Sequence, residues 1–140
     1  MTADVELTHL PDTLEMKVNT TPSAINCAAR VVAQAMNFHD IQHANPTGKV
    51  PRLDTRKEWV LLKPNGAKAA SLAVHCSPSS SRPNSPYTAA VLISRHAPVV
   101  LLQANQGVTD HKVAREVMMQ AFVRWALDIQ LDKRLLPRAE

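Results

Sequence analysis

The chain has 140 residues and a mass of 15.4 kDa, enough for one domain to fold without disulfides or a structural metal. Apolar residues make up 45% and charged residues 20% of it, which excludes a largely disordered chain. Two cysteines exclude a disulfide scaffold, and the longest apolar run, near 89–93, is too short to cross a bilayer. The acidic start does not resemble a secretory signal, so we expect a cytoplasmic protein with reduced cysteines.

The net charge of +4 and the pI of about 9.4 are unevenly distributed along the chain. Residues 1–21 are acidic, whereas residues 49–68 carry six basic and two acidic side chains, which equals the whole net charge. Such a segment is either a solvated loop or a surface for anionic partners such as nucleic acid. The candidate nucleic-acid-binding residues are Lys49, Arg52, Arg56, Lys57, Lys63 and Lys68.

The first half of the chain alternates between strand, helix and loop signals. Residues 4–19 alternate apolar and polar around Pro11-Asp12, which predicts a β-hairpin. Thr21 followed by Pro22 is typical of a helix start, and apolar residues at helical spacing predict a helix over about 22–40. A basic, proline-containing loop over about 41–57 is expected next.

Two further hairpins and a second helix are predicted after that loop. Residues 58–63 and 68–76 flank an Asn-Gly turn, and residues 87–94 and 99–103 flank a shorter one. The last two strands are nearly all apolar, which predicts central strands buried on both faces. A serine- and proline-rich loop over 77–86 separates the hairpins, and Thr109 is the expected N-cap of a helix that ends near Arg134.

These elements predict a single α+β domain over residues 1–140, in the order ββ-α-ββ-ββ-α. Tight turns favour a mainly antiparallel sheet with both helices packed on one face. The loops at about 41–57 and 77–86 are expected to be mobile. Many unrelated functions use such an arrangement, so the fold alone does not identify one.

Cys27 lies in the second turn of the first predicted helix, a common place for a nucleophilic cysteine. The candidate partners are His75, His96 and Asn105. Residues 87–94 and 99–107, with the Cys27 helix, resemble the secreted bacterial effector proteases of the papain-like class. Thr88 stands in the place of their histidine and Gln103 in that of their acid, so the resemblance implies a catalytically dead enzyme. The alternative is a small, buried, apolar cysteine.

His39 and His43 are four residues apart, a spacing that brings two side chains to one face of a helix and allows them to share a metal ion. No third ligand is evident, and the alternative is that both lie at the negative end of the helix dipole. With three glycines in the chain, glycine-rich phosphate loops are nearly excluded. We expect no cofactor and no metal, and the residues favour a non-enzymatic protein over an enzyme without deciding between them.

The leading hypothesis is a non-enzymatic interaction or assembly subunit. The second predicted helix is apolar over much of its circumference, which is typical of a helix that also packs on another chain. We expect it to dock on a protein partner or a second copy, together with the two long loops, and expect interface residues Phe122, Trp125 and Ile129. The alternatives are a nucleic-acid-associated protein that uses residues 49–68, and a papain-like effector fold.

Overall fold

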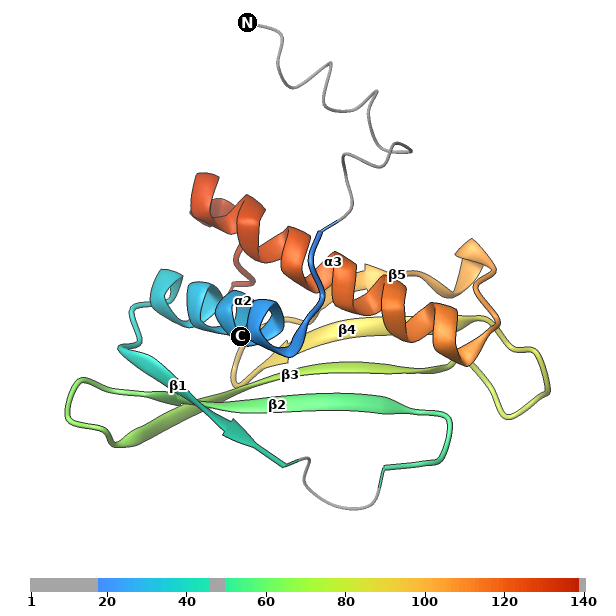
Figure 1. Ribbon diagram of the computed structural model, residues 1–140, viewed down its shortest axis with the longest axis horizontal. Helices are drawn as coiled ribbons and strands as arrows, with labels where there is room; N and C mark the ends of the chain where they lie inside the picture. The colour runs from blue at the N-terminus through green and yellow to red at the C-terminus, as the bar shows by residue number, and fades with distance from the viewer. Residues whose placement is uncertain (1–17, 46–49, 139–140) are drawn as a thin grey trace, which may run out of the picture.

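A computed structural model describes residues 18–45 and 50–138 of the chain. Five antiparallel strands form one sheet in the order β1-β2-β3-β4-β5, and both helices lie over the same face of it (Figure 1). The elements are α2 (Pro22–Ala35), β1 (Asp40–Ala44), β2 (Thr55–Leu62), β3 (Lys68–Pro78), β4 (Tyr87–Ile93), β5 (Val99–Leu102) and α3 (His111–Leu131), with short 3-10 turns at Ala104–Gln106 and Lys133–Leu135. None of the helices in these ranges is long and apolar enough to cross a membrane.

The predicted α+β class is confirmed, including the antiparallel sheet and the two helices on one of its faces. The two hairpins after residue 55 are confirmed as β2–β3 and β4–β5. The expected hairpin at 4–19 lies outside the described residues, except for its last two positions. The second helix begins one residue later than predicted, because Asp110 caps the backbone N–H groups of Lys112 and Val113.

The first helix is shorter than predicted, and the strand β1 was missed. Asn37 adopts a left-handed conformation with φ of 70°, and the N–H of Phe38 donates to the carbonyl of Ala33 at 3.0 Å. This is the hydrogen-bond pattern that closes a helix and reverses the chain. The chain then pairs with β2, from Asp40 opposite Leu62 onward, so a helix to residue 40 and a loop from residue 41 were wrong predictions.

The strand β5 does not lie in the centre of the sheet. It pairs only with β4, and Val100 on it is 47% exposed. In β4 the buried side chains alternate with less buried ones, so that Ala89 and Val91 face the helices whereas Leu92 faces solvent. Both strands are therefore buried mainly on one face, and their continuous apolar sequence was misleading.

The core lies between the sheet and the two helices, and an aromatic pair is at its centre. The rings of Trp59 on β2 and Phe122 on α3 are stacked, with centroids 5.7 Å apart and an angle of 14° between the planes. The indole nitrogen of Trp59 donates a hydrogen bond of 2.9 Å to the Oδ1 of Asn26 on α2. One tryptophan thus joins the sheet to both helices.

We expect Phe122→Ala to lower the free energy of unfolding by about 3–5 kcal/mol, since it removes a fully buried ring and leaves a cavity beside Trp59. Val113→Ala is the control, because Val113 lies on the same helix but is 50% exposed, and its loss should change the stability by less than about 0.5 kcal/mol. Urea unfolding of the three proteins measures the difference. Equal stabilities of the two variants would contradict the described core.

Candidate functional site

An apolar groove runs between α2 and α3 on the side that faces away from the sheet. It has a volume of about 310 Å³. We name it the helix-face groove, and its principal lining residues are Ala24, Cys27, Ala28, Val31, Val123 and Leu127. Small side chains of both helices leave this hollow, namely Ala24, Cys27 and Ala28 on α2 and Ala126 on α3.

Two leucines one helical turn apart stand out on the same side of α3. Leu127, at the edge of the groove, is 45% exposed, and Leu131 is 88% exposed. Residues four apart on a helix lie on one face, so the two leucines extend the apolar surface toward the end of α3. In the sequence, Leu127 and Leu131 are among the apolar residues that extend around the second predicted helix, but they are not among the expected interface residues.

The expected interface residues lie elsewhere. Phe122 and Ile129 are completely buried in the core of this chain, and Trp125 is partly buried with its ring tilted against Phe122. Phe122 and Ile129 therefore cannot contact a partner in the folded chain. The apolar residues that α3 does expose are Val113, Leu127 and Leu131.

The two cysteines differ in exposure. Cys27 is exposed in the helix-face groove, so the expectation that it is a buried apolar residue was wrong. Cys76 on β3 is buried. Burial, together with the nearby charge of Asp54, raises the pKa of the Cys76 thiol from 9.0 to about 11.

The candidate catalytic residues do not converge. Cys27 lies on the outer surface of the helix layer, whereas His75 precedes the core-facing Cys76 on β3 and so points to the opposite face of the sheet. There the Nε2 of His75 is 3.1 Å from the Oδ2 of Asp54. His96 contacts the carbonyl of Ser94 in the β4–β5 turn.

The positions compared with the papain-like proteases do not reach Cys27 either. Thr88 lies between Tyr87 and Ala89, both of which are buried toward the helices, and therefore faces the open side of the sheet. Gln103 follows β5, and Asn105 is exposed in the next 3-10 turn. None of these residues lines the helix-face groove with Cys27.

The two candidate metal ligands are not on a helix. His43 is in β1, where its ring packs edge-on against Trp59, with centroids 6.1 Å apart. His39 immediately precedes that strand. Four residues of extended chain span about 13 Å, too far for two imidazoles to share one ion. Within residues 18–45 and 50–138, no group of three or more metal-ligating side chains comes together.

The basic residues of the segment 49–68 are divided between the two ends of β2. Lys63 and Lys68 flank the β2–β3 turn, and Arg52, Arg56 and Lys57 lie at the other end. The eight residues of β2 span about 26 Å. The Nε of Arg56 is 2.7 Å from the Oε2 of Glu58. Lys49 lies outside the described residues. The five described residues therefore do not form a single basic patch.

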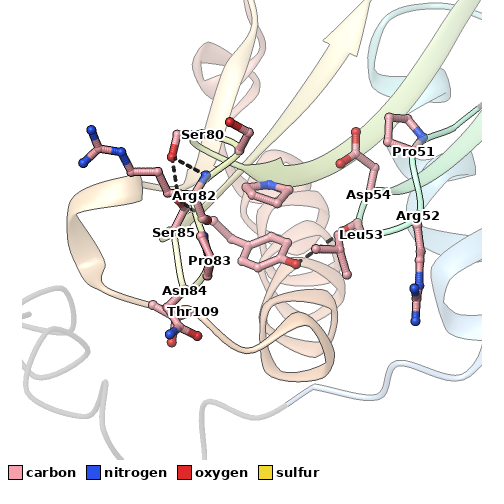
Figure 2. Close-up of a pocket in the computed structure, with 13 residues that line it drawn as sticks. Pro51, Arg52, Leu53, Asp54, Ser80, Arg82, Pro83, Asn84, Ser85 and Thr109 are labelled. Carbon is pink, nitrogen blue, oxygen red and sulfur yellow. Dashed lines mark hydrogen bonds between the residues drawn. The ribbon is translucent and has the colours of Figure 1, made fainter.

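The two long loops meet in a second cavity, of about 610 Å³ (Figure 2). The hydroxyl of Tyr87, the first residue of β4, donates to the carbonyl of Leu53 at 3.4 Å, which ties the segment before β2 to the end of the serine-rich loop. The serine-rich loop is closed by its own hydrogen bonds, among them Ser85 Oγ to the carbonyl of Arg82 at 2.7 Å. Figure 2 shows Arg52 and Arg82 extending away from each other at opposite ends of the cavity, so their charges do not converge on one point.

No protein-family model, no curated protein and no solved structure matches this chain. Its function must therefore be inferred from its own surfaces.

We expect one thiol per native chain to react rapidly with a disulfide reagent, because Cys27 is exposed and Cys76 is buried. The variant Cys27→Ser should lose the rapid reaction, whereas Cys76→Ala should retain it. Spectroscopic titration with and without denaturant counts the thiols. Rapid reaction of both thiols in the native protein would contradict the described burial of Cys76.

The raised pKa of Cys76 predicts a loss of stability in alkali. An unfolded chain releases this proton above about pH 9, whereas the folded chain holds it until about pH 11, so the free energy of unfolding falls over this interval. Cys76→Ala should show a smaller decrease than the wild type when urea midpoints at about pH 8 and pH 10.5 are compared. Parallel decreases would show that Cys76 does not contribute.

Proposed function

We propose that this protein is a non-enzymatic assembly subunit that binds a second copy of itself through the helix-face groove and the adjacent leucines. The observation that carries the proposal is that exposed leucines and an apolar groove lie next to each other on one surface. Leu127 and Leu131 project from α3, and the small side chains Ala24 and Ala28 leave the hollow beside them.

A two-fold dimer requires a surface that is complementary to itself, since each copy presents the same residues to the other. A projecting leucine that enters a hole between small residues is the usual contact of paired helices. Here the leucines of one copy would fill the groove of the other, and the reverse contact would form at the same time. Full burial of an exposed leucine contributes about 1.5–3 kcal/mol.

The charges of this face allow two copies to approach. The chain as a whole carries a net charge of +4, which opposes self-association over most of its surface. Beside the leucines, however, the Nε of Arg124 is 3.5 Å from the Oδ1 of Asp128. This i,i+4 pair is internally neutral, so that two such faces do not repel each other strongly.

A nucleic-acid interface along residues 49–68 has less support. Its basic residues lie at both ends of β2, and Arg56 is already paired with Glu58. A papain-like activity has less support still, because Cys27 and His75 are on opposite sides of the molecule. The assembly subunit is therefore the function that the described surfaces favour.

We expect the wild-type chain to become a dimer of twice 15.4 kDa as its concentration is raised to about 0.5 mM. The double variant Leu127→Gln/Leu131→Gln should be monomeric under the same conditions. Val113→Gln is the control, since Val113 is about as exposed as Leu127 and lies on α3 outside the groove. Light scattering on a sizing column measures the mass, and circular dichroism confirms that each variant is folded.

The exposed cysteine provides an independent test of the same interface. Labelling of Cys27 should slow as the protein concentration rises, and it should become independent of concentration in the double variant. A wild-type protein that remains monomeric over the whole range would overturn the proposal. A dimer that the double variant leaves intact would overturn it as well.

A further inference from the structure

A third cavity lies where α2, β2 and the first half of α3 meet. It has a volume of about 450 Å³, within the range of small-molecule sites. We name it the basic cavity, because three cationic residues line it: Arg56 and Lys57 from β2 and Arg115 from α3. Arg56 and Lys57 belong to the basic segment 49–68, whereas Arg115 lies nearly sixty residues further along the chain and is not among the predicted binding residues.

Two of these cations have no acidic partner among the described residues. Arg56 is paired with Glu58, but neither Lys57 nor Arg115 forms an ion pair in the part of the chain that the structure describes. Like charges that share a cavity raise its potential and favour an anion there. Lys57 and Arg115 are therefore the principal candidates to hold one.

One carboxylate also lines the cavity. Glu116 accepts two hydrogen bonds at its Oε2, from Thr20 Oγ1 at 3.1 Å and from Gln120 Nε2 at 2.9 Å. These bonds hold the carboxylate beside α3, and it offsets only one of the two unpaired cations. The cavity keeps an excess of positive charge.

The start of α2 adds to this excess. Pro22, the first residue of the helix, lines the cavity, and the first turn of α2 contains no acidic residue. The positive end of the helix dipole is therefore not neutralised by a side chain of its own turn. This contribution supports the lysine and the arginine and does not replace them.

The cavity also has an apolar wall. Ile25 and Met119 line it and belong to the core, with exposed fractions of 5% and 6%. Cations beside an apolar surface suit a ligand with an anionic group on an apolar or aromatic body. The hydroxyl group of Thr55, which also lines the cavity, can donate to such an anionic group.

From this arrangement we propose that the basic cavity binds a small organic phosphate. Lys57 and Arg115 hold the phosphate group, with a threonine hydroxyl as a further donor, and the body of the ligand packs on Ile25 and Met119. Arginine is well suited to this role because its planar fork matches the phosphate oxygens. The proposal depends on residues other than those of the proposed dimer face.

The test is a nuclear magnetic resonance titration of the full chain with adenosine 5′-monophosphate, inorganic phosphate and adenosine. We expect the monophosphate to shift the amide signals of residues 20–25, 55–57 and 115–119. Inorganic phosphate should shift the same signals less, because it lacks the adenosine part that packs on the apolar wall. Adenosine should bind least, because it lacks the charged phosphate group. No shift with the monophosphate up to about 10 mM, a very weak affinity, would overturn the proposal.

Charge-matched variants separate a specific site from a general basic surface. The double variant Lys57→Gln/Arg115→Gln should lower the affinity for adenosine 5′-monophosphate by at least about ten-fold, as expected for the loss of charge-assisted contacts. Lys63→Gln/Lys68→Gln removes the same charge at the far end of β2, where both lysines are exposed, and should leave binding unchanged. Equal weakening by both pairs would overturn the proposal.

A short single-stranded oligonucleotide is the last ligand to compare, because a nucleic acid carries the same phosphate groups as the mononucleotide. The cavity should bind the mononucleotide without needing neighbouring nucleotides. Binding of the oligonucleotide alone, with a strong dependence on salt, would show a polynucleotide surface and overturn the small-ligand assignment.

Discussion

The stack of Trp59 on Phe122 is the contact on which the rest of the structure depends. It fixes α3 over the middle of the sheet, and the hydrogen bond from the indole to Asn26 fixes α2 beside it. Since the indole is buried, its N–H must have a partner, and Asn26 supplies it, so α2 is bonded to the same tryptophan on which α3 packs. The helix-face groove lies between these two helices, and the basic cavity lies where both of them meet β2.

Much of the fold could be predicted from local signals. The Asn-Gly turn, the Thr-Pro helix start and the apolar stripe of α3 each act over a few residues, and each led to the right element. The prediction failed where an element depends on contacts with segments that are distant in the sequence. The left-handed Asn37 closes α2, but the chain after it is a strand because it pairs with β2, and β5 is an edge strand although its sequence resembles that of a central one.

The candidate sites were harder to predict, because each combines distant segments. Cys27 was noted as one residue of a helix, but its exposure depends on how α3 packs beside it. Lys57 was noted as part of a basic segment, but Arg115, which shares its cavity, comes from the other helix. The segment 49–68 had a conspicuous total charge, and the fold distributed that charge over two ends of a strand. Basic residues that are close together in the sequence therefore do not lie close together in the folded chain.

The lengths of the outer strands have a consequence for aggregation. β1 has five residues and β5 has four, and Pro98 immediately precedes β5. Free strand edges are templates for uncontrolled pairing between chains, and short edges next to proline limit that growth. The edges of the sheet therefore offer little unpaired backbone on which a fibril could extend. Ordered association then depends on side chains of the helices.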